Sequence, residues 1–273
     1  MQYRKVFTLV LVTNLFGLSP SNADSTIEFH VEEGQKKAVQ PVVVKDGQIM
    51  VKGAGGDHNL DIFYQRADER LVLIDHKKQR FTPITEEKID QIARQTQDLQ
   101  PVLQGLGDQL KKLSPKQRAK WEEMLGGISI DQLGSGENPA SGSRLVKTGR
   151  DKQVAGINCE QLDVLKGSAK LAEVCLANPS SMQLSADDYA TIRSLLAFTQ
   201  RIATKAQGFA SQFGISLPPI ELSDLAGVPV EMVDFSGKRP TIMALNRITD
   251  SVSPDDRLQV PPGYQSQELT LWR

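Results

Sequence analysis

VAGINCEQLDVLKGSAKLAEVCLA, residues 154–177, contains both cysteines of this 273-residue chain. Apolar and polar residues alternate on each side of Lys166-Gly167-Ser168, which predicts two antiparallel strands joined by a tight turn. With the turn centred on Gly167, Cys159 lies directly opposite Cys175. Opposed Cα atoms in an antiparallel pair are about 4.5 to 5.5 Å apart, within the range that a disulfide spans. We therefore expect a Cys159–Cys175 disulfide.

The alternative for these two thiols is redox chemistry or metal binding. A redox pair normally has C-x-x-C spacing, and no histidine lies near either cysteine in the sequence to complete a zinc site. A structural bridge is the interpretation that fits the spacing. Closing a loop of about 15 residues stabilises a protein by roughly 3 kcal/mol in the chain-entropy model.

The N-terminus predicts export. Arg4 and Lys5 precede an apolar run from Val6 to Leu18, and Ser21-Asn22-Ala23 supplies small residues after it. This pattern is typical of a secretory signal peptide, residues 1–23, cleaved after Ala23. The run is shorter than the roughly 20 residues that span a bilayer, so we expect no integral membrane segment in the mature chain. The expected location is periplasmic or secreted, where disulfides persist.

Composition limits the class of the mature chain, residues 24–273. Its 30 basic and 33 acidic residues nearly balance, and no basic stripe with interleaved aromatics occurs, so we expect no nucleic-acid partner. A hydrophobic fraction of 39% suffices for a packed core. The length suits one large β-containing domain or two small ones, and we expect a single domain.

Strand patterns occupy both ends of the mature chain. Residues 26–82 read as strand, turn, strand, and Lys45-Asp46-Gly47 is typical of a type I′ hairpin turn. After residue 227 the predicted strands are Val228–Phe235, Thr241–Thr249 and Arg257–Val260.

Helical patterns lie between these strands. Thr85 is a good N-cap for a helical segment over residues 85–133, in which Pro101 should break or kink the helix. Ser114-Pro115-Lys-Gln117 predicts a further helix start, and a second long helix follows Ser185 and ends at Gly208. The predicted fold class is α+β: a curved antiparallel sheet, an unclosed half-barrel, with helices packed on its concave face.

No catalytic or metal-binding motif stands out. Nucleophile elbows, zinc helices, EF-hand loops and P-loops are all absent from the sequence. The three histidines, His30, His58 and His76, fall in a strand or beside polar turns, and we expect them to be unrelated surface residues. We therefore expect no catalytic residues, no metal and no cofactor.

Several segments resemble a family of uncharacterised secreted bacterial proteins. They are Gly156-Ile157-Asn-Cys159, Glu173-Val-Cys175-Leu-Ala177, Leu184-Ser-Ala-Asp-Asp188, Gly227-Val-Pro-Val230 and Pro261-Pro-Gly-Tyr264. Those proteins look similar to the lipoprotein-carrier (LolA/LolB-like) architecture. The resemblance implies an unclosed antiparallel half-barrel with helices on its concave face.

These observations favour a non-enzymatic envelope protein that binds a hydrophobic ligand, such as a lipid acyl chain, between sheet and helices. Apolar burial would supply the binding energy. The candidate lining residues are Leu103, Leu106, Leu195, Leu196 and Ile202.

Two other functions stay open. In the first, the core is fully packed and the protein is an envelope interaction module, with the helix Pro115–Leu125 and its Trp121 contacting a partner. In the second, the protein is a hydrolase, which requires a histidine beside a carboxylate and a hydroxyl in a cleft.

Overall fold

The computed structural model describes residues 25–54, 59–124, 143–210, 227–235, 237, 239–250 and 258–269. Within these residues, twelve strands form one open sheet with a few helices packed against it, which confirms the α+β class. The predicted signal peptide, residues 1–23, lies outside the described residues. The strands are β1 (Ser25–Glu33), β2 (Lys36–Lys45), β3 (Gln48–Val51), β4 (Leu60–Gln65), β5 (Arg70–Asp75), β6 (Arg80–Ile84), β7 (Arg144–Val154), β8 (Ile157–Lys166), β9 (Ala169–Ala177), β10 (Val228–Asp234), β11 (Thr241–Thr249) and β12 (Gln265–Ser266). The helices are α1 (Glu86–Lys111), α2 (Pro115–Met124) and α3 (Ala186–Ala210), with a 3₁₀ turn at Pro179–Met182.

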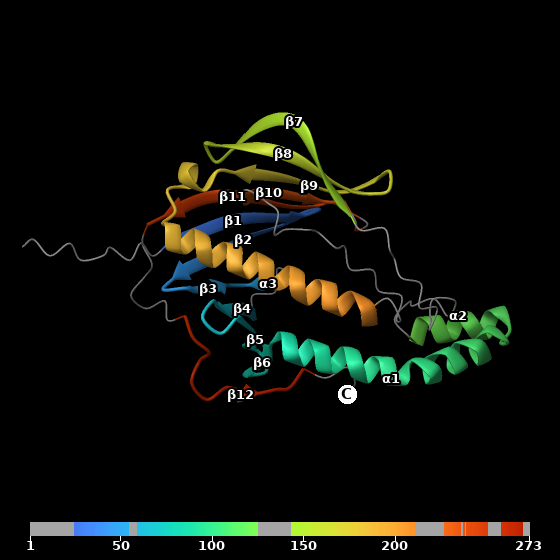
Figure 1. Ribbon diagram of the computed structural model, residues 1–273. Helices are drawn as coiled ribbons and strands as arrows, with labels where there is room; N and C mark the ends of the chain where they lie inside the picture. The colour runs from blue at the N-terminus through green and yellow to red at the C-terminus, as the bar shows by residue number, and fades with distance from the viewer. Residues whose placement is uncertain are drawn as a thin grey trace, which may run out of the picture.

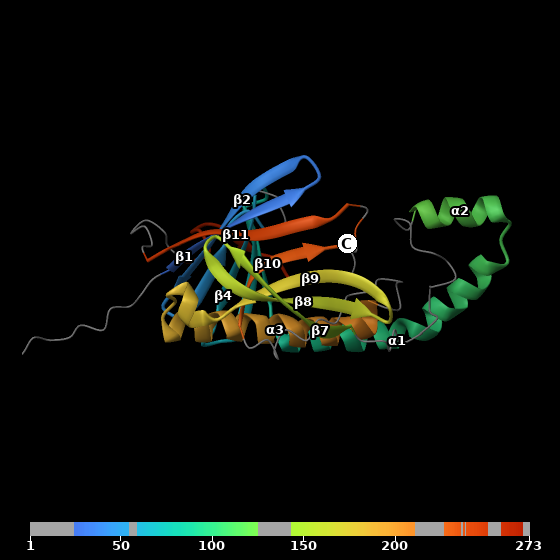
Figure 2. The same cartoon turned by 90° about the horizontal axis from the view of Figure 1, so that it is seen from above.

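The sheet consists of two meanders joined in the middle. The strand order is β12-β6-β5-β4-β3-β2-β1-β11-β10-β9-β8-β7. From β1 to β6 the chain runs outward on one side, and from β7 to β11 it returns inward on the other, so β1 and β11 meet at the centre (Figure 1). All the strand pairs described are antiparallel except β12 with β6. Figure 2 shows the sheet bending around α3.

Most of the predicted strands are confirmed. The turn between β2 and β3 has positive φ at Asp46 (49°) and Gly47 (73°), as a type I′ turn requires. Strand β7 was not predicted, because its polar residues show no regular alternation with apolar ones. The strand predicted at Arg257–Val260 is wrong: residues 258–260 are irregular, and the C-terminal strand is the two-residue β12.

The disulfide is confirmed, but the predicted register of its hairpin is wrong. Cys159 lies opposite Ala177, and Cys175 lies opposite Gln161. The turn is centred between Gly167 and Ser168, and a bulge follows Val164, so the register moves by two residues. The bridge therefore joins diagonal neighbours, whose Cα atoms are 5.4 Å apart. The twist of a sheet shortens one diagonal between paired strands, which keeps this spacing within disulfide range.

The helices begin where their caps predict. The Thr85 side chain accepts a hydrogen bond from the Lys88 backbone N–H (3.3 Å), and Gln117 Oε1 accepts from the backbone N–H of Ser114 (3.1 Å). Helix α1 continues across Pro101 and curves in its outer half (Figure 2), so the proline bends the helix rather than ending it. Helix α3 also extends past Gly208, to Ala210. Residues 125–133 of the predicted helical segment lie outside the described residues.

The main core lies between the inner face of the sheet and α3, and α1 packs beside α3. It draws on strands from both meanders and includes the cystine. Its buried residues are Ile27, Phe29, Val44, Ile49, Tyr64, Leu71, Val154, Cys159, Cys175, Ala177, Met182, Phe198, Val228, Val230 and Leu245. A second group on the opposite face, which we call the outer cluster, contains Val43, Met50, Phe63, Val72, Ile74 and Leu258.

Both edges of the sheet carry features that oppose pairing with other chains. On β6, strand β12 covers Arg80 and Phe81, and Pro83 lacks the N–H that another strand would need. On β7, the register shifts between Lys147 and Arg150, where Gly149 has a φ of 68°. Bulges and basic residues on an edge strand discourage strand addition.

Reduction of the disulfide should destabilise the protein by about 3 kcal/mol, because the bridge closes a loop of 16 residues in sequence separation. Urea unfolding of the wild type and of the Cys159→Ser/Cys175→Ser variant checks this. Equal midpoints would contradict it, and adding a reductant to the double variant should change nothing.

Gly227→Ala should destabilise the protein by roughly 1 to 3 kcal/mol, because an ideal Cβ there lies 2.6 Å from the backbone oxygen of Ala177. Gly105→Ala is the matched control. Its Cβ meets nothing within 4 Å, and alanine in a helix should be neutral or stabilising. Thermal unfolding of both variants checks the contrast, and equal melting temperatures would contradict it.

Candidate functional site

The space predicted to hold a ligand is occupied by side chains of α3. Phe198 (1% exposed) packs against Tyr64 (0% exposed), with ring centroids 5.6 Å apart. The Tyr64 hydroxyl shares a 2.7 Å hydrogen bond with the Ser194 hydroxyl, so the polar end of this buried ring is also satisfied. Helix and sheet thus meet in direct contact at this point.

Of the five predicted lining residues, four have described side chains, and none of these four lines the grooves described below. Leu195 and Ile202 pack, partly buried, against the main core, and Leu196 is half-buried on the same helix. Leu106 is 46% exposed on α1, and the side chain of Leu103 lies outside the described residues. Leu195 and Ile202 therefore act in packing.

Ion pairs connect α3 to Arg66 and to α1. Arg66, after β4, contacts the Asp187 carboxylate (2.7 Å) at the start of α3. Farther along α3, Arg201 pairs with Glu86 of α1. Lys205 pairs with Asp90 of α1 (2.7 Å). The helix is therefore held to the sheet by apolar packing and to its neighbours by charge.

The ion pairs between α1 and α3 shift the pKa values of their members. The hydrogen bond from Arg201 holds the pKa of Glu86 below its usual range, and Lys205 adds to the effect. The same bond raises the pKa of Arg201. At the buried start of α3, the Ser25 hydroxyl donates to Asp188 Oδ2 (2.7 Å), which satisfies this carboxylate at 3% exposure.

His76 is not the isolated surface residue that the sequence indicated. Its Nε2 lies 2.8 Å from Asp61 Oδ2, and its Nδ1 lies 2.9 Å from the Tyr264 hydroxyl. Asp61 also accepts a hydrogen bond from the backbone N–H of Gly53 (3.0 Å). The three side chains come from β4, from the turn that follows β5 and from the C-terminal segment. Sequence reasoning missed them because nothing in their spacing predicts this approach.

A histidine beside a carboxylate and a hydroxyl is the arrangement that a hydrolase would need, but a cleft is also required. Four grooves of the described surface are lined by residues other than Asp61, His76 and Tyr264. Of the other histidines, His30 is exposed on β1 and His58 lies outside the described residues. Within the described part of the chain, no three His, Cys, Asp or Glu side chains gather closely enough to hold a metal ion.

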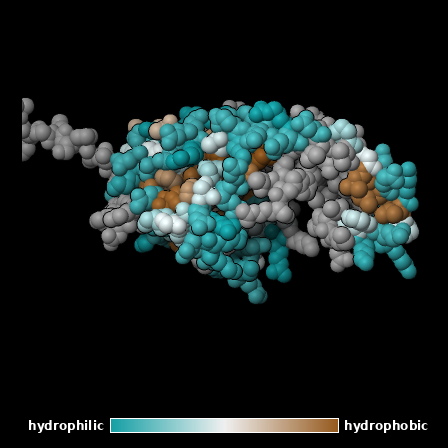
Figure 3. All heavy atoms as spheres, turned by 90° about the horizontal axis from the view of Figure 1, so that it is seen from below, coloured by the Kyte–Doolittle hydropathy of each residue, from teal (hydrophilic) through white to brown (hydrophobic). Residues whose placement is uncertain are grey.

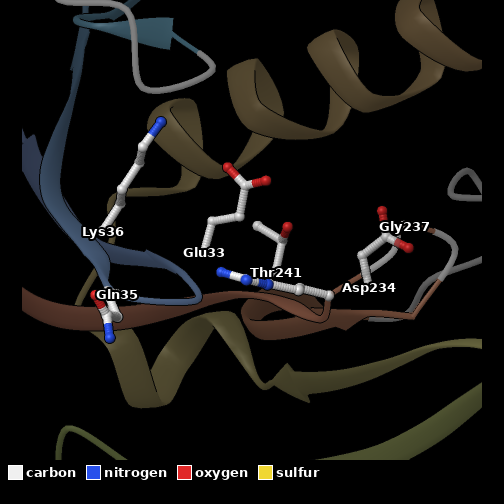
Figure 4. A pocket seen from close by; sticks show the side chains of 7 residues that line it. Glu33, Gln35, Lys36, Asp234, Gly237 and Thr241 are labelled. Carbon is white, nitrogen blue, oxygen red and sulfur yellow. The ribbon is translucent and has the colours of Figure 1, made fainter.

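One groove, of about 560 Å³, lies where the β1–β2 and β10–β11 turns meet (Figure 4). Glu33, Thr241 and Asp234 extend into it from neighbouring strands, with Lys36 on the opposite side. Carboxylates and cations mix along its wall, so no single ligand charge is favoured.

A more distinctive surface is the part of α1 and α2 that extends beyond the sheet, residues 105–124, which we call the helical arm (Figures 1 and 2). Two of its large apolar residues are exposed, Leu106 by 46% and Trp121 by 39%. In the view from below, hydrophobic residues show at this end of the molecule with hydrophilic ones around them (Figure 3).

Comparisons with known proteins find similar structures only. No family model and no curated protein matches the chain. Among solved structures, PNGF-II has a TM-score of 0.40 and 8% identity over 91% of this chain, which spans only 31% of that one. An uncharacterised conserved protein from Thermus thermophilus has a TM-score of 0.41 and 7% identity, covering 91% and 92% of the two chains. The MucA/MucB complex of Pseudomonas aeruginosa has a TM-score of 0.30 and 13% identity, covering 86% and 55%. At these levels no residue role passes from those proteins to this chain.

No helix among the described residues is both long and apolar enough to cross a bilayer.

Glu86→Gln should weaken the attachment of α3 to α1 and lower stability at pH 7 by up to about 1 kcal/mol, as for a partly exposed ion pair. Because the folded-state pKa of Glu86 is lowered, its contribution is present above the unfolded value and is lost as the pH falls through the folded value. The melting temperatures of wild type and variant should therefore converge in acid. Glu33→Gln is the control, since Glu33 forms no ion pair within the described residues. A difference that persists in acid would contradict the assignment.

Proposed function

We propose that this protein is a non-enzymatic, extracytoplasmic interaction module that binds an acidic protein partner through its helical arm. The observation that carries the proposal is the arm itself. It extends beyond the sheet (Figure 1) and exposes Leu106 and Trp121, while α3 fills the inner face that a ligand would need.

Packing of the inner face supports binding at the outside rather than within. A bound acyl chain would have to displace Phe198 from Tyr64 and break the Tyr64–Ser194 hydrogen bond. Displacing α3 would also separate ion pairs such as Arg201–Glu86. These contacts oppose ligand entry and hold the sheet as a fixed base for the arm.

The charge of the arm indicates the chemistry of the partner. Between Leu106 and Trp121 the sequence has five basic residues and one acidic residue, and Glu122 and Glu123 follow. Tryptophan and arginine are the residues that most often dominate binding energy at interfaces. A partner with an acidic rim around an apolar pocket would match Trp121 and its basic neighbours, Arg118 and Lys120.

A membrane surface fits this arm less well than a protein does. Helices that lie in a bilayer interface carry a continuous apolar face opposite their basic one. In α2, Pro115–Met124, seven of the ten residues are Lys, Arg, Glu, Gln or Pro, and no apolar stripe runs along the helix. A single exposed tryptophan among charges is more typical of a protein contact.

The test is site-specific photo-crosslinking in cells that export the protein. A photoreactive residue at Trp121 should capture one stoichiometric protein with an acidic surface, and the same residue at exposed Val39 on β2 is the matched control. With the captured protein purified, Trp121→Ala should weaken binding more than tenfold, as loss of a central aromatic anchor does, and added salt should weaken it too.

Three results would overturn the proposal. If photoreactive residues at positions 121 and 39 crosslinked the partner equally, the arm would not be the binding site. Co-flotation of the protein with anionic vesicles, lost in Trp121→Ala, would assign the arm to a membrane. A native mass that includes a co-purified lipid would return the function to ligand binding on the inner face.

A further inference from the structure

A C-terminal segment of the chain covers the outer-cluster residues of β2–β5. Residues 258–268, which we call the strap, run across the outer face of β2–β6. Leu258 is 8% exposed within that cluster, and Val260 and Tyr264 pack against it. In Figure 1 the strap lies along the β5–β6 side of the sheet, on the far side from β7.

The strap is bound as an added strand. It pairs with β6 in parallel, and the Gln265 N–H donates to the Gln79 oxygen (3.1 Å) while the Gln267 N–H donates to the Phe81 oxygen (2.8 Å). Addition of an extended segment to a sheet edge is a common mode of peptide recognition, in which main-chain bonds supply affinity and side-chain pockets supply specificity. The short parallel pairing differs from the antiparallel pairs of the rest of the described sheet.

Tyr264 is the specific anchor of the strap. Its hydroxyl reaches His76 Nδ1 at 2.9 Å, and the two rings meet edge to face with centroids 5.7 Å apart. Asp61 holds the other ring nitrogen of His76 at 2.8 Å and so fixes the imidazole. A phenol hydroxyl both donates and accepts hydrogen bonds, so this contact can form with either tautomer of the imidazole.

The main core does not include the strap. No strap residue belongs to the buried set of that core, whose members end at Leu245. The outer-cluster residues of β2–β5, together with the β6 edge, therefore form a surface that the strap occupies from outside.

We infer that this surface is a peptide-docking site, which the protein's own C-terminus occupies. Its ligand class is an extended segment with two aliphatic residues separated by one position, a proline-glycine bend, and a tyrosine whose hydroxyl reaches the Asp61–His76 pair. The strap itself has this pattern, Leu258-Gln-Val260-Pro-Pro-Gly-Tyr264. A partner segment of the same chemistry would bind by replacing it.

The test uses the full mature chain and a labelled peptide of residues 258–269. A host variant, Leu258→Ser/Tyr264→Ala, weakens the resident strap, and fluorescence anisotropy measures peptide binding in trans. The host should bind the peptide, and the wild type should bind it at least tenfold more weakly because its site is occupied. A peptide with Tyr264→Phe should bind up to about tenfold more weakly, as expected for one lost hydrogen bond.

The matched controls are two histidine substitutions in the host. His76→Ala should weaken peptide binding as much as the phenylalanine peptide does, whereas His30→Ala, at an exposed position on β1, should leave it unchanged. The inference would be overturned if a folded host did not bind the peptide, or if His76→Ala left the affinity for the peptide unchanged.

Should the host not fold, hydrogen exchange of full-length Tyr264→Phe decides the question. Faster exchange at the Gln265 and Gln267 amides, with the β1–β11 amides unchanged, supports a separately docked strap. Uniform acceleration across the sheet would refute it.

Discussion

The pairing of β1 with β11 is the contact on which the rest of the sheet depends. It joins Ser25–Glu33 to Thr241–Thr249, segments far apart in the sequence, and it connects two meanders that would otherwise be separate sheets. Glu28 strengthens the join through Arg247, whose Nη2 lies 2.6 Å away, next to a register shift between Glu28 and Phe29. Because so distant a pairing costs loop-closure entropy, it is favourable only when apolar residues of both meanders share one core. Phe29 and Leu245 lie opposite each other in that core.

The apolar residues on the two faces of this bent sheet are buried by different segments of the chain. On the inside, α3 supplies Phe198 and its neighbours, and charge pairs with α1 keep the helix in place. On the outside, the C-terminal strap rather than a helix covers the apolar residues of β2–β5, with Leu258 and Tyr264. The inner segment is integral to the fold, whereas the outer one is an addition at its edge.

The two proposed binding surfaces lie at different ends of the molecule. The helical arm extends past the sheet and presents Trp121 among basic residues, and the strap site lies over β5 and β6. Lys88, near the start of α1, pairs with Glu268 of the strap, so the helix that carries the arm also touches the strap. The packing of α3 on the inner face holds the strands in place, and these strands support both proposed surfaces.

The sequence by itself determined the local elements: the Asp46-Gly47 turn, the Thr85 cap and most strands follow from spacing and turn chemistry. The Cys159–Cys175 bridge was predicted because these are the two cysteines of the chain and lie in strands of one hairpin. The sequence did not determine the hairpin register, since a bulge after Val164 depends on how the strand packs rather than on any local signal. Nor could it show that α3 closes the inner face or that His76 meets Asp61 and Tyr264, the latter 188 residues away in sequence. Those facts were decided by the tertiary structure, because short-range periodicity sets which face of a strand is apolar but not which distant segment covers it.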